Sequence, residues 1–390
     1  MTESPALVLV TSSFPISGDG SEAAGAFVAD LAEELAQHVP VRVVAPGDQD
    51  AIESWSENVD VFRYRTPDQP LSTLRPWHPA DALKISRVML GGARATERAV
   101  SAGSVAHILA LWALPCGEWA RRSSQRHACT YSVWTLGSDI WSLGRLPVVR
   151  SRLRTILAGA THCWSDGLRL MEDTRAIAGR EVAFLPSTRR IDRVRLESMR
   201  SQPPYRFLFL GRWHPNKGVD LLLEALACLS TSDWNHVERV VVAGGGPLDA
   251  NVRAAVRKFQ QEAKPVELRN YLTRDEAQDT MLASDFLLIP SRIESIPVVF
   301  SDAMKLDLPV IATPVGDLQA LVLGQPGCGV MADAVHAQSF AAAIQQASCV
   351  SPADFRVGVR RAKKNFDLPL VAMNIARMVT EQTVASRPGH

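Results

Sequence analysis

Short apolar runs alternate with amphipathic stretches along most of the chain. In the first half these runs are Ala6–Val10, Val41–Ala45, Val105–Leu111, Tyr131–Leu136, Ala160–Trp164 and Val182–Leu185. In the second half they are Phe207–Leu210, Val240–Ala243, Val266–Arg269, Phe286–Ile289 and Pro309–Ala312. Runs of this kind are typical of parallel strands that are buried on both faces, with helices between them. The pattern predicts an α/β fold with two Rossmann-like, doubly wound parallel sheets.

A polar, charged segment that ends in Pro203-Pro204 separates the two halves. We expect an N-terminal domain at 1–187, a linker at 188–204, a C-terminal domain at 205–366 and a final helical segment at 367–390. Parallel sheets bind ligands at the carboxyl ends of their strands, so we expect the site in a cleft between the domains.

Composition narrows the class of protein. A formal net charge of +1 gives no electrostatic basis for a nucleic-acid partner. The six cysteines lie far apart, with no metal-ligand spacing, which favours a reducing compartment. We expect the N-terminus to form a first strand and not a signal peptide, because it carries no basic region and only a brief apolar run, and no apolar stretch approaches the ~20 residues of a transmembrane helix. We therefore expect a cytoplasmic protein, at most peripheral at the inner face of a membrane.

Residues 50–80, which follow the second apolar run, are expected to be irregular. Two later segments carry clustered basic residues. On a helix predicted at 81–99, four cations fall in one narrow sector: Lys84, Arg87, Arg94 and Arg98. The second segment, Val148–Leu157, carries further arginines. A solvated helix face explains both segments, although the first stripe also suits a phosphorylated acceptor or an anionic membrane.

The stretch from Pro290 to Val315 predicts a strand end, a loop, a helix and a further strand. Pro297 is expected as the first residue of the helix, where its missing N–H costs nothing. Glu294 and Asp302 lie on either side of the helix N-terminus. Helix N–H groups and two carboxylates suit a phosphorylated, hydroxyl-rich ligand such as a nucleotide sugar. The alternative is that neither acid binds a ligand, with Glu294 a solvated loop residue and Asp302 an acid in the first turn of the helix.

This stretch resembles the E-x7-E signature of the retaining, two-Rossmann-domain (GT-B) glycosyltransferases, especially glycosyltransferase family 4. The resemblance implies that Glu294 contacts the donor sugar and that Asp302, where the family more often has Glu, holds the ribose. Pro297 stands where many members have Gly. The backbone around it is implied in substrate binding, through Ser295, Ile296, Pro297 and Val298.

Two further motifs of the second half resemble the same family. Gly211-Arg212 followed by Lys217-Gly218 matches G-R-x-x-x-x-K-G, in which Arg and Lys neutralise the donor diphosphate. This role has a physical basis, because a departing diphosphate gains negative charge that a guanidinium and an ammonium stabilise. Residues Asn270, Tyr271 and Leu272 lie where the family holds the nucleobase. The last helix, at about 369–383, resembles the segment that crosses back to the N-terminal domain.

The first half resembles the family more loosely. Gly25 is a candidate for close backbone approach to a ligand, and a plain loop glycine is an equal alternative. Asp139, in Gly137-Ser138-Asp139, is placed for ligand contact, or is an N-cap or turn aspartate. Leu111 and Leu136 stand where the family has histidines, which puts any histidine-dependent contact in doubt.

The resemblance implies transfer of a sugar, with retention, from a nucleotide sugar to a glycan or lipid-linked acceptor in surface glycan assembly. The C-terminal domain would bind the donor, and the N-terminal domain the acceptor. Without an Asp-x-Asp motif we expect no cofactor and no metal. A nucleotide-sugar epimerase of the same architecture and a non-catalytic partner subunit are the alternatives.

Overall fold

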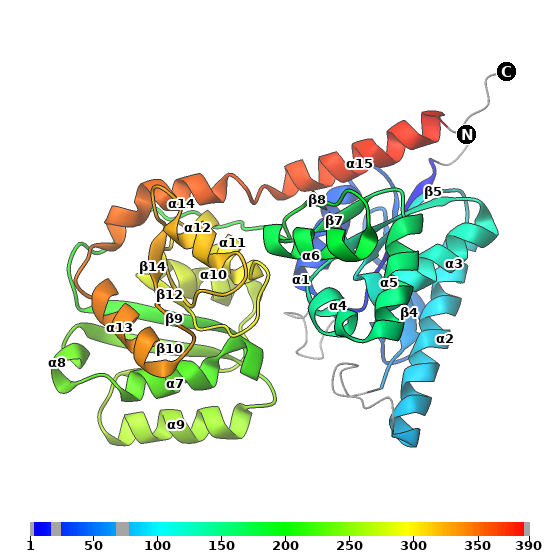
Figure 1. The fold of residues 1–390 in the computed structure, drawn as a ribbon. Coiled ribbons are helices and arrows are strands. Elements are labelled where there is room, and N and C mark those ends of the chain that lie inside the picture. The colour runs from blue at the N-terminus through cyan, green and yellow to red at the C-terminus, as the bar shows by residue number, and fades with distance from the viewer. Residues whose placement is uncertain (1–3, 17–24, 68–77, 386–390) are drawn as a thin grey trace. The chain divides into compact units, whose positions relative to one another are not determined.

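The computed structural model describes residues 4–16, 25–67 and 78–385. The chain divides into two compact units (Figure 1). The first consists of Met1–Pro186 together with Leu368–His390, and the second of Ser187–Asp367. Each unit has its own sheet with helices on both faces, so each is described by itself.

The sheet of the first unit has the strand order β3-β4-β2-β1-β5-β6-β7-β8. Its strands are β1 (Ala6–Val10), β2 (Val41–Gly47), β3 (Ala51–Ser56), β4 (Val59–Arg65), β5 (Val105–Leu111), β6 (Thr130–Thr135), β7 (Cys163–Ser165) and β8 (Ala183–Phe184). All neighbours are parallel except β3 and β4. This antiparallel pair corrects the expectation that residues 50–80 are irregular, within the part that is described. Val59 and Val61 of β4 are buried, which explains why the segment joins the sheet.

Helices bury both faces of this sheet. They are α1 (Ala26–Leu35), α2 (Pro79–Ser101), α3 (Glu118–His127), α4 (Ser138–Trp141), α5 (Pro147–Gly159), α6 (Leu168–Ala178) and α15 (Leu368–Ala385). Leu7 and Leu9 of β1 pack in a core with residues of α1 and α15. Val8 and Val10 point to the opposite core, which α2, α3 and α5 cover. This alternation explains why β1 is apolar at every position.

The sheet of the second unit is wholly parallel, with the strand order β11-β10-β9-β12-β13-β14. Its strands are β9 (Tyr205–Arg212), β10 (Val237–Gly245), β11 (Val266–Arg269), β12 (Phe286–Ile289), β13 (Val310–Ala312) and β14 (Gly329–Met331). The helices are α7 (Val219–Ala227), α8 (Thr231–Trp234), α9 (Asp249–Gln261), α10 (Arg274–Leu282), α11 (Val298–Lys305), α12 (Leu318–Leu323), α13 (Ala337–Ala347) and α14 (Arg356–Lys363). The chain runs outward from β9 to β11 and then returns to β12 on the other side of β9. The point where the strand order reverses therefore lies between β9 and β12.

The segment expected to be an interdomain linker packs on the second unit. Thr188 Oγ1 donates a hydrogen bond to the carbonyl of Phe366 at 3.2 Å. The Arg195 guanidinium donates to four backbone carbonyls, which belong to Met281, Leu282, Ser284 and Leu306. These contacts fix the segment along the helices of the second unit.

A buried carboxylate ties α3 to α5 in the first unit. The side chain of Glu118 is 4% exposed and pairs with the guanidinium groups of Arg121, Arg122 and Arg152. Burial alone would raise the pKa of Glu118, but the hydrogen bonds from Arg121, Arg152 and Arg122 outweigh it and lower the pKa. A carboxyl whose pKa is lowered on folding stabilises the protein above its unfolded pKa, and this contribution is lost as the pH falls through the folded pKa.

We expect Glu118→Gln to lower the stability of the first unit at neutral pH by about 1.5–3 kcal/mol, because charge-assisted hydrogen bonds are lost. The loss should shrink as the pH falls below the unfolded pKa of about 4.3 and disappear once the pH has fallen through the lowered pKa of the folded carboxyl. Thermal unfolding followed from pH 7 to acid pH measures both effects. Glu181→Gln is the control, since Glu181 is 92% exposed in its pair with Arg175. An equal effect of the two variants, or a Glu118→Gln effect independent of pH, would contradict this assignment.

Candidate functional site

The loop after β9 carries the two predicted cations. Arg212 ends the strand and is exposed, and its guanidinium has no recorded partner among the described residues. The chain then forms a short 3-10 turn, Pro215–Lys217, before α7. Gly218 follows in the left-handed region with φ +69°, and a Cβ there would lie 1.8 Å from the carbonyl oxygen of Pro290. Glycine at 218 therefore lets this loop lie directly against the end of β12.

The loop after β12 is held by its neighbours on both sides. The backbone N–H of Arg292 donates to Asn216 O at 2.8 Å, and its guanidinium donates to Pro215 O at 2.8 Å. On the other side, Thr313 Oγ1 donates to Ser291 O at 2.5 Å. A Cβ at Gly316 would lie 2.1 Å from Glu294 O, so the loop after β13 also approaches closely. The backbone that carries Glu294 is thus fixed from two strands.

Lys217 and Glu294 form an ion pair between the two loops, at the point where the strand order reverses. The Glu294 side chain is 11% exposed and the Lys217 side chain 37% exposed, so the pair lies at a partly buried surface. Ser291 Oγ lies 3.4 Å from the same carboxylate oxygen. The structure therefore brings together two residues that the sequence predicted separately, 77 positions apart.

His214, which sequence reasoning missed, organises the cationic loop. Its Nδ1 accepts a hydrogen bond from the backbone N–H of Asn216 at 3.2 Å, and it caps the 3-10 turn that contains Lys217. Burial, and then the positive charges of Arg212 and Lys217, lower the pKa of His214 below its usual 6.5. A neutral imidazole is the form that accepts this bond. A residue able to accept a hydrogen bond just before a Pro-initiated turn was the signal in the sequence.

Helix α11 begins beside Glu294. Val298–Lys305 is helical as expected, but Pro297 precedes the helix, with ψ 133°, instead of being its first residue. Ser295 and Ile296 are buried, and Ser295 Oγ has no hydrogen-bond partner in the part of the chain that the structure describes. The first N–H groups of a helix have no intrahelical acceptor, so this end offers donors to an anion.

The predicted nucleobase segment lies at the ends of β10 and β11. Asn270 Oδ1 accepts from the Arg253 guanidinium at 2.7 Å, and Tyr271 Oη donates to Gly245 O at 2.8 Å. Tyr271 is 47% exposed, so one part of its ring faces solvent.

The neighbouring glycines bring β9 and β10 close together. A Cβ at Gly244 would lie 1.9 Å from Gly211 O. Gly211 itself has room for a side chain, since a Cβ there meets only Phe209 at 3.8 Å. The predicted Gly211 therefore contributes its carbonyl to this close contact, and Gly244 is the position that requires glycine.

Asp302, which the sequence predicted as the ribose ligand, is buried and paired with Arg189. Its side chain is fully buried, and Oδ2 accepts from Arg189 Nε at 3.0 Å. Its other oxygen is buried without a hydrogen-bond partner among the described residues. In this arrangement Asp302 presents no carboxylate oxygen at the surface. Together with Lys305, which donates to Thr188 Oγ1 and Arg189 O, it fastens the start of the second unit to α11.

Asp139 and Gly25 belong to the first unit, and the structure favours a structural reading of both. Asp139 is 1% exposed, and its carboxylate accepts from the backbone N–H of Ala113 at 2.7 Å. Burial raises its pKa to about 6, although that backbone hydrogen bond and the one from Leu136 oppose the rise. These contacts support the alternative reading, in which Asp139 stabilises the local backbone at the start of α4. Gly25 has φ +76°, and a Cβ there would lie 2.6 Å from the backbone of Ser13.

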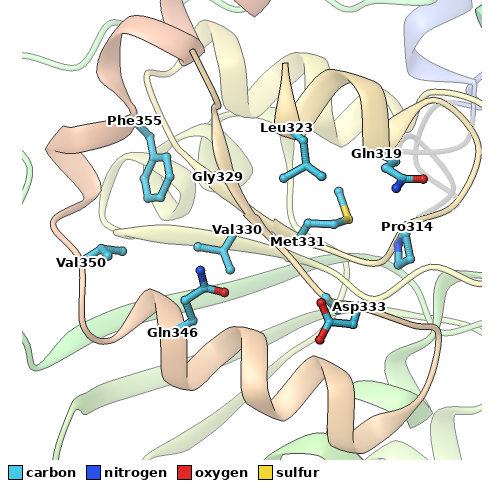
Figure 2. A pocket seen from close by; sticks show the side chains of 11 residues that line it. Pro314, Gln319, Leu323, Gly329, Val330, Met331, Asp333, Gln346, Val350 and Phe355 are labelled. Atoms are coloured by element: carbon cyan, nitrogen blue, oxygen red, sulfur yellow. The ribbon is translucent and has the colours of Figure 1, made fainter. Parts of the chain in front are cut away.

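A pocket of about 380 Å³ lies elsewhere in the second unit, along the edge strand β14. Figure 2 shows Leu323, Met331 and Phe355 around it, with the polar ends of Gln346 and Asp333. It contains none of the predicted site residues. We place the candidate site at Lys217 and Glu294 instead, because charged groups from separate strands converge there at the strand ends.

Among the described residues, no group of three or more His, Cys, Asp or Glu side chains is positioned to hold a metal ion. No helix in the same residues is long and apolar enough to cross a bilayer.

The chain is similar to known glycosyltransferases in sequence. Residues 204–348 match the family model described as "Glycosyl transferases group 1". A D-inositol 3-phosphate glycosyltransferase of Streptomyces bingchenggensis is 36% identical over 121 residues, which are 30% of this chain and 27% of that protein. The chain thus spans about a third or less of the length of the first curated relatives it matches.

Similarity to solved structures extends over both units. Sucrose-phosphate synthase from Thermosynechococcus elongatus has a TM-score of 0.70 at 17% identity, covering 98% of this chain and 100% of that one. Anabaena HepE, solved in complex with UDP and glucose, has a TM-score of 0.68 at 14% identity, covering 97% and 100%. At such identities the likeness shows the fold, and it confirms the fold class predicted from the sequence. The chain has the GT-B type of fold, and its residues 204–348 are similar to the group 1 glycosyltransferases.

Proposed function

We propose that the chain is a retaining glycosyltransferase of family 4 that transfers a sugar from a nucleotide sugar to a glycan or lipid-linked acceptor in surface polysaccharide or glycoconjugate assembly. The observation that carries this proposal is the convergence of Arg212, Lys217 and Glu294 at the reversal point of the second sheet. This site lies within the residues that match the group 1 family. The second unit would bind the donor, and the first unit the acceptor.

The charges of the site fit a nucleoside diphosphate. Arg212 offers a planar fork of donors to the phosphates, and Lys217 offers a point charge. The diphosphate displaces Glu294 from Lys217, because two phosphates carry more negative charge than one carboxylate. The freed Glu294 carboxylate then accepts hydrogen bonds from the donor sugar. The N-terminus of α11 and the unpartnered Ser295 hydroxyl supply further donors as charge builds on the leaving group.

The other residues of the donor site have supporting roles. The backbone of Ile296, Pro297 and Val298 borders the phosphates, and the segment Asn270–Leu272 holds the base. The exposed ring of Tyr271 offers a stacking surface. We assign Asp302 a positioning role through Arg189 in place of the ribose contact, since its carboxylate is buried. The reaction takes place in the cytoplasm or at the inner face of the membrane.

Arg212→Ala should weaken the binding of a nucleoside diphosphate by about tenfold to a hundredfold, because a charge-assisted contact worth ~1.5–3 kcal/mol is lost. Titration calorimetry with UDP, GDP and ADP measures the change and identifies the base. Arg360→Ala, which removes an exposed arginine of α14, is the matched control. Wild-type affinity in Arg212→Ala would remove the phosphate role from this residue.

Glu294→Gln should lower kcat by about a hundredfold, since it removes the charge beside the reacting sugar but keeps the shape of the side chain.

Asp302→Asn should instead lower the melting temperature and leave the donor KM within about threefold, because a positioning role affects stability more than ground-state binding. Steady-state kinetics with saturating acceptor, together with thermal unfolding, measures both variants.

Arg189→Gln distinguishes the two roles considered for Asp302. If Asp302 acts through Arg189, then Arg189→Gln and Asp302→Asn share one pattern of stability and kinetics. A donor KM raised about tenfold in Asp302→Asn alone would restore the direct ribose contact and refute the positioning role.

Removal of metal should leave turnover unchanged, because Arg212, Lys217 and the N-terminus of α11 neutralise the diphosphate. The measurement is the rate of sugar transfer after dialysis against EDTA, compared with the rate after added Mg²⁺ or Mn²⁺. Loss of activity with rescue by Mn²⁺ would reveal a metal requirement that these cations do not meet.

A further inference from the structure

The segment Leu143–Arg150 runs from the 3-10 turn after α4 into the first turn of α5 in the first unit (Figure 1), and it exposes apolar side chains beside arginines. Leu143 is 40% exposed, Leu146 56% and Val148 84%. Arg145 and Arg150 are exposed as well. We call these five residues the 143–150 patch. Such a grouping of large apolar side chains at a surface marks an interaction site more often than chance exposure.

The core of the first unit does not need these apolar residues. Helix α5 is already anchored by Leu153, Ile156 and Leu157, which are fully buried. Leu146 occupies the N-cap position of α5, where Ser, Thr, Asp or Asn would stabilise the helix by accepting a backbone hydrogen bond. A leucine cannot accept this hydrogen bond, so the helix N-terminus lacks a side-chain cap. We infer that the exposed apolar side chain serves a contact outside the helix.

Along the chain, the charge of this segment has a single sign, although Asp173 of the neighbouring helix α6 accepts a hydrogen bond from Trp141 Nε1 at 2.7 Å. Between Ile140 and Ser165 the sequence has four arginines and neither Asp nor Glu, although the whole chain has a net charge of only +1. Arg152 is neutralised by Glu118, and Arg154 donates to the carbonyl of Ile177. Arg145 and Arg150 have no recorded side-chain partner among the described residues, so their charges remain for an external anion.

The basic stripe on α2 is a weaker candidate. Leu83 and Leu90 are exposed there beside arginines, but the same helix carries Asp81 and Glu97. Arg98 donates to Arg63 O at 2.9 Å, so one of the four predicted cations is already engaged within the unit. The 143–150 segment itself carries no acidic residue, so it combines apolar exposure with positive charge more completely than the α2 stripe does.

We propose that the 143–150 patch docks the protein on an anionic phospholipid bilayer. Leu146 and Val148 enter the boundary between head groups and acyl chains, while Arg145 and Arg150 bind lipid phosphates. Apolar burial and attraction to anionic lipid act together in such peripheral contacts. The proposal names a surface apart from the donor site, and it does not depend on the transfer reaction, because vesicle binding is measured without donor or acceptor.

Co-sedimentation of the full chain with vesicles tests this proposal. Wild type should bind phosphatidylcholine vesicles that contain phosphatidylglycerol, bind pure phosphatidylcholine vesicles weakly, and dissociate as salt is added. Leu146→Ser with Val148→Ser, and separately Arg145→Gln with Arg150→Gln, should each weaken binding by about tenfold or more. Ile52→Ser is the control, since Ile52 is 60% exposed on β3, beside Glu53.

Equal binding to neutral and anionic vesicles, or undiminished binding by both double variants, would overturn the proposal. Concentration-dependent self-association without vesicles, abolished by the same substitutions, would assign the patch to a second copy of the chain instead. The single variant Val148→Ser keeps the test decisive if a double variant fails to fold, because this side chain is the most exposed of the three.

Discussion

The pairing of β9 with β12 is the constraint on which the candidate site depends. These strands are neighbours in space, but the chain leaves them in opposite directions along the sheet. The loops that follow β9 and β12 therefore start side by side and lead away from each other, and Lys217 and Glu294 pair between them. Gly218 permits the approach, because any Cβ there would collide with Pro290 O. A parallel sheet without this reversal would place the two residues over different strands.

The same site concentrates groups that the fold alone would not favour. Arg212 is a cation without a recorded partner among the described residues, and Ser295 Oγ is a buried hydroxyl without one. His214 is held neutral between two cations and accepts a backbone hydrogen bond. Proteins tolerate such local costs chiefly where a ligand removes them. In the structure the charges of Lys217 and Glu294 balance each other within this site.

The sequence predicted the strands and helices that local residue patterns determine. It did not predict the side-chain partners that come from distant parts of the chain. Apolar runs identified both sheets, and α11 occupies the predicted residues Val298–Lys305. The β3–β4 pair was missed, because β3 has no buried residue and the polar Asp60 and Arg63 interrupt the apolar residues of β4. The sequence did not show that Asp302 pairs with Arg189, because the two residues lie 113 positions apart. Asp139 likewise accepts from Ala113, 26 positions earlier. No spacing rule shows which carboxylate a remote donor will bury.

The return of α15 to the first unit has a consequence for the order in which the protein is made. The first unit takes its core from both ends of the chain, since Leu368, Val371 and Ile375 pack with residues of β1 and α1. The second unit is continuous from Ser187 to Asp367. On the ribosome its sequence is therefore complete while the first unit still lacks one helix. Strand β1, which precedes the whole second unit in the chain, therefore belongs to the unit that is finished later, and until α15 is made one apolar face of its sheet remains partly uncovered.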